Sequence, residues 1–128
     1  MIYLDTSVAL AYLLAEDKSP PEKLWQETLI SSRVLEYEVW TRIHGRNLTR
    51  SHSDEVRSLL NRIAFIELST AVLTRALEPF PKPVRTLDAL HLASMDFLQR
   101  QGQAIILASY DSRLTATARA LRIPIYKL

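Results

Sequence analysis

The sequence predicts an α/β fold in which helices cover both faces of a central, mostly parallel sheet. Short apolar stretches alternate along the chain with longer segments of helical periodicity, the pattern of parallel strands joined by crossover helices. The chain has 128 residues, of which 48% are hydrophobic and 23% charged, and a chain of this size and composition buries a core of its own. We therefore expect a single domain spanning residues 1–128.

The first half of the chain holds two expected strands and four expected helices. Residues 2–4 form a short apolar run, and the mostly apolar stretch that begins at Ser7 indicates a buried helix. Pro21 suits the first turn of the next helix, and Ser32 and Ser51 stand at the N-cap positions of the two helices after it. The expected strands are 2–4 and 29–31, and the expected helices are 7–14, 22–28, 33–44 and 52–61.

The second half continues the alternation with three strands and three helices. Prolines at positions 79, 81 and 83 predict an extended loop, because proline disfavours helix at the residue before it. Thr86 is the expected N-cap of a long helix that ends at Gln101 and is terminated by Gly102. The expected strands are 64–68, 104–108 and 124–126, and the other expected helices are 69–77 and 112–121.

The composition excludes several kinds of site. The sequence has no cysteine, which removes disulfides, thiolate zinc sites and cysteine nucleophiles, and which suits the cytoplasm where we expect the protein. No apolar run approaches the roughly 20 residues that cross a bilayer, so we expect no membrane association. The net charge is only +2, which does not indicate a strong general attraction to nucleic acid.

Acidic residues follow two of the expected strands. Asp5 comes after the strand at 2–4 and Asp111 after the strand at 104–108, each just before a helix. Because ligands of an open α/β sheet bind outside the carboxyl ends of its strands, these two side chains are expected to be neighbours. Glu38 and Asp88 lie near the starts of two further helices. If they face the same crevice, the sheet edge carries a cluster of oxygen ligands.

Each acid taken alone also has a purely structural explanation. Asp5 and Asp111 suit N-caps, Asp88 suits the positive end of a helix dipole, and Glu38 could pair with Arg42 one turn further on. Helical periodicity does not separate Glu38 from its neighbour at position 36, because both flank the apolar stripe of their helix. A further acid at position 96 is excluded, since it lies about 12 Å along the helix from Asp88.

Four segments carry a resemblance to a known family. They are Ile-Tyr-Leu-Asp-Thr-Ser at 2–7, the stretch 32–38, Thr-Leu-Asp-Ala-Leu-His-Leu-Ala at 86–93 and Ser-Tyr-Asp-Ser-Arg-Leu at 109–114. With them the chain resembles, along essentially its whole length, the PIN-domain ribonucleases and, within them, the VapC-type toxins of toxin-antitoxin pairs. The family often has glycine where this chain has Arg122. The spacing from Ser32 matches Glu38 to the family acid.

The resemblance implies a PIN-like three-layer α/β/α fold and a toxin that cuts RNA endonucleolytically. It implies a cognate antitoxin and a homodimer as partners, and Asp5, Glu38, Asp88 and Asp111 as catalytic residues. Four carboxylates at close range cannot all stay ionised without a cation, and oxygen ligands without cysteine suit Mg²⁺ or Mn²⁺. On this hypothesis Asp5 and Asp88 are the central ligands, while Glu38 and Asp111 complete the set directly or through water.

Several neighbouring residues have expected supporting roles. Thr6 offers a hydroxyl to the site, or simply begins a helix, and His91 is expected to pack in the core rather than to bind metal. Arg42 and Arg46 are four residues apart on one helix and can hold RNA phosphates, although a solvated face is the commoner meaning of such a pair. The large rings Trp25, Tyr37 and Trp40 are expected to be mostly core, with the remainder lining a groove for the antitoxin.

Two alternative functions remain open at this point. A receiver-like phosphoacceptor domain has a similar length and architecture, but the central strand at 64–68 is followed by Ser69 where an acceptor aspartate would stand. The second alternative is a non-catalytic subunit that binds an antitoxin or acts as a repressor. Cleavage of total RNA by the purified protein separates an enzyme from both.

Overall fold

Four parallel strands form the central sheet of the computed structural model, which describes residues 1–128. The strands are β1 (Ile2–Leu4), β2 (Leu29–Ser32), β3 (Ile63–Ile66) and β4 (Ile106–Ala108). They are arranged in the order β3-β2-β1-β4, and every neighbouring pair is parallel. The predicted α/β class with a parallel sheet is thereby confirmed, and β1 lies in the interior of the sheet with β4 on one side and β2 on the other.

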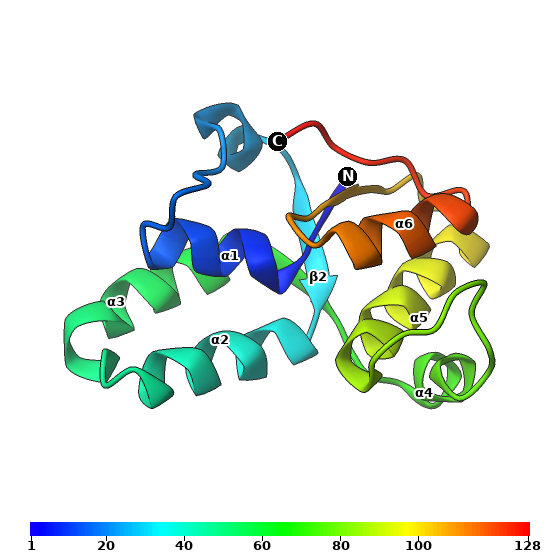
Figure 1. Cartoon of the computed structure of the whole chain (residues 1–128), viewed down its shortest axis with the longest axis horizontal. Helices are drawn as coiled ribbons and strands as arrows, with labels where there is room; N and C mark the ends of the chain where they lie inside the picture. The colour runs from blue at the N-terminus through cyan, green and yellow to red at the C-terminus, as the bar shows by residue number, and fades with distance from the viewer.

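Helices cover both faces of the sheet, as Figure 1 shows. One layer contains α1 (Thr6–Leu13), the 3₁₀ helix η1 (Glu22–Gln26), α2 (Val34–Gly45) and α3 (Thr49–Leu60). The opposite layer contains α5 (Thr86–Arg100) and α6 (Ser112–Ala120), with α4 (Thr70–Ala76) packed against α5. No helix combines the length and the apolar character that crossing a membrane requires.

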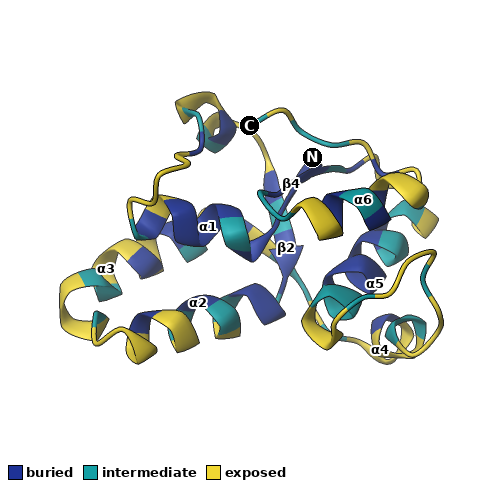
Figure 2. Cartoon of the chain, in the orientation of Figure 1, coloured by how far each residue is buried: buried dark blue, intermediate teal, exposed yellow.

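Two hydrophobic cores result from the alternation of side chains along the strands. In β1, Ile2 and Leu4 belong to the core under α1, α2 and α3, whereas Tyr3 between them belongs to the core under α5 and α6. This is the expected consequence of a strand whose successive side chains point to opposite faces. Figure 2 shows the buried faces of the helices turned toward the strands.

The structure corrects one expected helix start and two expected N-caps. Helix α3 begins at Thr49 rather than at 52: Asn47 turns the chain with a positive φ of 58°, and Leu48 occupies the N-cap position. Ser51 is therefore inside that helix and does not cap it. Thr86 does not cap α5 either, since it is the first helical residue.

The last expected strand, 124–126, is reduced to one bridge. Ile125 pairs in parallel with Leu107, the N–H of Leu107 donates to the carbonyl of Pro124, and the N–H of Tyr126 donates to the carbonyl of Leu107. Pro124 has no N–H of its own, so it cannot extend the ladder. The other boundaries agree with the sequence to within a few residues, and Gly102 adopts the positive φ of 82° expected of the residue that terminates α5.

Candidate active site

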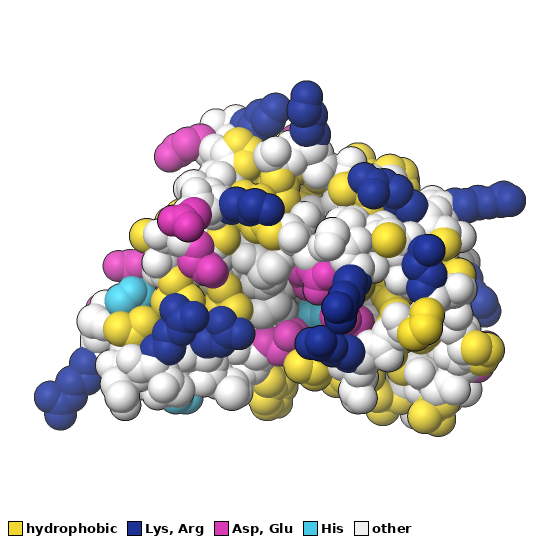
Figure 3. Space-filling model, in the orientation of Figure 1, with side chains coloured by type: hydrophobic (Ala, Val, Ile, Leu, Met, Phe, Trp, Pro, Cys, Tyr) yellow, Lys and Arg dark blue, Asp and Glu magenta, His cyan; other side chains and the backbone are white.

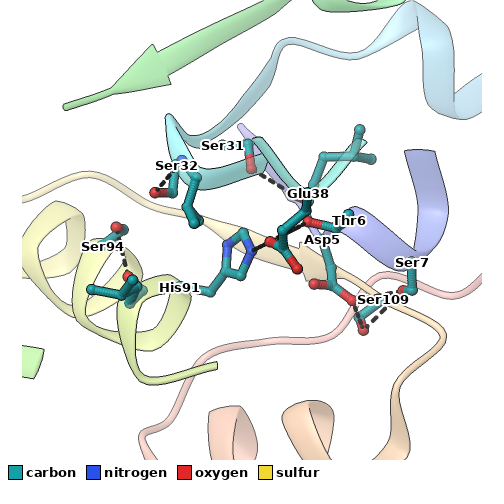
Figure 4. Close-up of polar contacts among 12 residues, drawn as sticks. Asp5, Thr6, Ser7, Ser31, Ser32, Glu38, His91, Ser94 and Ser109 are labelled. Carbon is teal, nitrogen blue, oxygen red and sulfur yellow. Dashed lines mark hydrogen bonds and ion pairs between the residues drawn. The ribbon is translucent and has the colours of Figure 1, made fainter. Parts of the chain in front are cut away.

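The carboxyl ends of β1 and β4 bring two distant parts of the chain together. Leu4 pairs with Ala108 in the sheet, and the N–H of Asp5 donates to the carbonyl of Ala108 at 3.0 Å. Asp5 and Asp111 therefore follow adjacent strands at one edge, as expected from the parallel topology. Figure 4 shows Asp5, Thr6, Glu38 and His91 converging at this edge from different elements.

Asp5 is held by two serine hydroxyls. Its Oδ2 atom accepts a hydrogen bond from Ser7 Oγ at 2.6 Å and another from Ser109 Oγ at 2.8 Å. Asp5 is only 5% exposed and occupies the N-cap position of α1, as considered above, but its side chain makes no capping hydrogen bond. No hydrogen bond reaches its other oxygen, Oδ1.

Glu38 is held in a similar way from another direction. Its Oε1 atom accepts from Thr6 Oγ1 at 2.7 Å and from His91 Nε2 at 2.7 Å, and Oε2 accepts no hydrogen bond. No ion pair joins it to Arg42, contrary to the structural explanation considered above. Glu36 points elsewhere and pairs with Arg33 at 2.5 Å. The tertiary structure thus brings Glu38, and not Glu36, to the edge of the sheet.

A buried hydrogen-bond network holds Glu38 in place through His91. His91 is 1% exposed, and its Nδ1 atom lies 2.8 Å from the hydroxyl of Tyr3, which is fully buried. The Tyr3 oxygen also accepts from the backbone N–H of Ser32 at 3.2 Å. Because Nε2 of His91 faces a carboxylate oxygen, we assign its proton there and treat Nδ1 as the acceptor for the Tyr3 hydroxyl. Burial, and next the charge of Asp5, raise the pKa of Tyr3, so this hydroxyl keeps its proton.

Asp88 is the acid without a hydrogen-bond partner. It lies in the first turn of α5, and burial, followed by the charges of Asp111 and Asp5, raises its pKa above the usual range. The charge of Glu38 raises the same pKa. The like charges of the other three acids therefore act on Asp88, which is the electrostatic sign of a shared cluster.

Asp111 has the structural role that was considered as an alternative for it. Its Oδ1 atom accepts from the backbone N–H groups of Arg113 at 2.9 Å and Leu114 at 3.2 Å, which caps α6. Its Oδ2 atom accepts no hydrogen bond. Capping thus occupies one oxygen of this carboxylate and leaves the second one available.

The four acids share one property that bears on metal binding. Each keeps at least one carboxylate oxygen without a hydrogen bond, because the donors around Asp5, Glu38 and Asp111 all reach a single oxygen. No three His, Asp or Glu side chains are arranged so that they already form a metal-binding group. The donor set, all carboxylate oxygens and no cysteine, nevertheless fits a hard divalent cation. The excluded acid, Asp96, pairs instead with Arg75 at 2.8 Å.

Arginines without ion pairs flank the acids on two sides. Arg42 and Arg46 line a groove of about 520 Å³ together with Glu38, and Arg85 and Arg113 line a pocket of about 220 Å³ together with Asp88. All four are exposed, and none of them forms an ion pair. Figure 3 shows basic side chains on both sides of the central acidic group. Of these four, only Arg42 and Arg46 were expected from the sequence pattern.

Comparison with known proteins identifies the family. The family described as PIN domain matches residues 2–120 of the chain. The chain belongs to the PIN-domain family. It is 30% identical to a protein named Ribonuclease VapC35 of Mycobacterium tuberculosis, over 98% of this chain and 95% of the relative. It is 28% identical to Ribonuclease VapC47 of the same species, over 93% of this chain and 90% of the relative. The resemblance stated from the motifs is confirmed.

Solved structures agree with this PIN-domain fold. The crystal structure of Mycobacterium tuberculosis VapC20, described as a toxin that cleaves the sarcin-ricin loop, matches with a TM-score of 0.69 at 18% identity, over 91% of this chain and 94% of that chain. A chain of a toxin-antitoxin complex from Klebsiella pneumoniae matches with a TM-score of 0.62 at 15% identity, over 91% of each chain. At these identities the likeness concerns the fold, and the predicted PIN-like three-layer arrangement is confirmed.

Three further residues of the site were not expected from the sequence. Ser7 and Ser109 hold Asp5, and Tyr3 supports His91, yet none of the three was proposed. A signal was present for the serines, because both are small hydroxyl residues within two positions of an expected site acid. Tyr3 had no such signal, since a tyrosine in a buried strand is indistinguishable from an ordinary core residue. His91 is buried as expected, but it contacts Glu38 directly.

Proposed function

We propose that this PIN domain is a metal-dependent endoribonuclease that hydrolyses RNA phosphodiester bonds as the toxin of a toxin-antitoxin pair. The observation that supports the proposal is the position of the acids: Asp5 and Asp111 follow the paired strands β1 and β4, and the charges of Asp111, Asp5 and Glu38 all raise the pKa of Asp88. Relatives that bear the name ribonuclease and match nearly the whole chain support the same activity.

The proposed cofactor is Mg²⁺, or Mn²⁺ in its place. Asp5 and Asp88 would be its central ligands, with Glu38 and Asp111 completing the set directly or through water. When bound, such an ion supplies Lewis-acid activation of water and stabilises charge on the phosphate. The raised pKa of Asp88 supports this assignment, because a group of like charges gains most from a cation.

The remaining groups orient these carboxylates and the RNA. Ser7 and Ser109 fix Asp5 through one oxygen, which directs its other oxygen away from them. Thr6 and His91 do the same for Glu38. Arg42 and Arg46 carry no ion pair to an acid, so their guanidinium groups are free to bind RNA phosphates beside the cluster.

We also propose the biological setting of this activity. The proposed partners are the RNA substrate and a cognate antitoxin protein, and a solved neighbour of the same fold is a chain of a toxin-antitoxin complex. A homodimer, one domain over residues 1–128, and a cytoplasmic location without membrane association complete the proposal. These statements rest on the family and on the composition.

The test compares two site variants with a matched control. The purified protein is incubated with total RNA and Mn²⁺, and cleavage is followed by gel electrophoresis. Asp5→Asn and Asp88→Asn are each expected to reduce the rate by more than about 100-fold, because loss of groups that merely orient ligands already costs 10–100-fold. Asp54→Asn removes the same charge from an exposed site on α3 and is expected to leave the rate unchanged.

Each result has a definite meaning. Full activity in Asp5→Asn or Asp88→Asn would remove that residue from the mechanism. If the unmodified protein cuts no RNA with Mn²⁺ but still binds an antitoxin, the non-catalytic subunit is the correct description. Circular dichroism of each variant shows whether its fold is retained.

A further inference from the structure

The groove beside Glu38 contains an aromatic ring that the proposed chemistry does not use. The groove of about 520 Å³ is formed by α2 and the first turn of α5. Its volume lies within the range of pockets that hold small organic groups. Among the residues that line it are Tyr37, Glu38, Arg42, Arg46 and Leu87.

Tyr37 is exposed, contrary to the expectation that it is mostly core. It is 68% exposed, it has no aromatic partner, and its hydroxyl makes no hydrogen bond within the protein. The two tryptophans behave differently, since Trp25 packs against Tyr12 and Trp40 stacks on His44, and both lie against the core. The folded chain therefore leaves one large ring of the three in solvent, next to a site carboxylate.

Leu87 provides a second apolar surface in the same groove. It is 45% exposed and directly precedes Asp88, so it connects the groove to the first turn of α5. Arg42 and Arg46, which have no acidic partner, supply positive charge along the α2 side. A solvent-exposed ring beside unpaired arginines is the combination with which proteins hold single-stranded nucleic acid, because bases stack on rings while arginine contacts phosphates.

We propose that this groove binds one unstacked nucleotide of single-stranded RNA adjacent to the bond that is cut. Its base stacks on Tyr37 and contacts Leu87, and its phosphates contact Arg42 and Arg46. The inference rests on the proposed ribonuclease function. RNA is favoured over a protein segment as the occupant because Glu38 belongs both to the groove and to the carboxylate cluster, which makes the groove continuous with the proposed cleavage site.

This placement limits the form of the substrate. A base in a regular duplex is stacked on both faces and paired at its edge, so it cannot lie on Tyr37 without being extruded. The protein is therefore expected to bind a single-stranded or loop segment in preference to a duplex of the same sequence.

The experiment measures binding of a fluorescein-labelled single-stranded RNA by fluorescence anisotropy. All chains carry Asp88→Asn so that the RNA stays intact. Adding Tyr37→Ala is expected to weaken binding about 5- to 150-fold, the range that corresponds to loss of one base stacked on an aromatic ring. Tyr37→Phe keeps the ring and is expected to bind within about 2-fold of the parent. Leu77→Ala removes a more exposed apolar side chain on the opposite layer, 88% exposed, and is the matched control with no expected change.

A second readout shows whether the carboxylates are disturbed. In the chain that retains Asp88, Tyr37→Ala is expected to leave the shift of melting temperature by Mn²⁺ unchanged. Equal RNA affinity of the Tyr37→Ala and parent chains would overturn the inference, and so would an equal loss in Tyr37→Phe, which would point to the hydroxyl. Loss of binding to an antitoxin alone would assign the groove to that protein. If the chain without substitutions neither binds nor cuts RNA, the proposed function itself fails.

Discussion

Removal of one buried oxygen tests the network beneath Glu38. In Tyr3→Phe the ring remains, but the hydroxyl that contacts His91 Nδ1 at 2.8 Å and Ser32 N at 3.2 Å is lost. Both partners are in the interior, with His91 at 1% exposed and Ser32 fully buried. Each unsatisfied polar group costs about 1–3 kcal/mol, so two of them predict a loss of about 2–6 kcal/mol in the free energy of unfolding. That is a large share of the 5–15 kcal/mol typical of a domain.

The assay is equilibrium unfolding in urea, followed by circular dichroism at neutral pH without metal. Tyr37→Phe is the matched control, because its hydroxyl is exposed and makes no hydrogen bond, and we expect it to change the free energy of unfolding by less than about 0.5 kcal/mol. Tyr3→Phe is expected to lower the midpoint clearly while the slope stays the same. Equal midpoints for the two variants would refute the hydrogen-bond network drawn around His91.

Three further predictions concern the acids and the arginines. Mn²⁺ at about 100 times its dissociation constant is expected to add about 2.7 kcal/mol to the free energy of unfolding, a rise of roughly 10 °C in calorimetry, and no shift at millimolar metal contradicts the carboxylate site. The pKa of Asp88 is raised by burial and by Asp111, so the folded state binds this proton more tightly than the unfolded state, and stability is lost as pH rises through the folded pKa. Asp88→Asn removes this loss. Without metal, the free energy of unfolding of the variant minus that of the unmodified chain is therefore expected to increase from pH 4 to pH 7. The increase is less than about 1 kcal/mol, because the side chain is partly exposed. If urea titrations show that this difference in the free energy of unfolding decreases as the pH rises, the like-charge cluster is contradicted. Arg42→Ala with Arg46→Ala is expected to weaken RNA binding similarly for all sequences and to reduce the salt dependence by about 0.7 per lost phosphate contact, and an unchanged slope between 50 and 200 mM salt would exclude both contacts.

Local sequence signals predicted most of the fold because they act over a few residues. The apolar run Ile2–Leu4, the prolines at 79–83 and Gly102 each act through backbone geometry or burial that neighbouring residues determine. Two boundary errors occurred where one local signal was weighed above another. The chain turns at Asn47, so α3 begins before Ser51, the serine that was expected to cap it. Pro124 has no N–H, and the final strand is reduced to a single bridge.

By itself the sequence determined which acids follow buried strands, whereas the pairing of β1 with β4 in the folded sheet placed Asp5 and Asp111 at the ends of adjacent strands. Its periodicity did not separate Glu36 from Glu38, because both flank the same apolar stripe, and only the family spacing from Ser32 favoured Glu38. The tertiary structure decided this choice by pairing Glu36 with Arg33 and placing Glu38 between Thr6 and His91. It also decided that Tyr37 is exposed while Tyr3 supports the site. The physical reason is that periodicity records which side of an element is apolar, whereas a hydrogen bond between residues 53 positions apart exists only after the layers have packed.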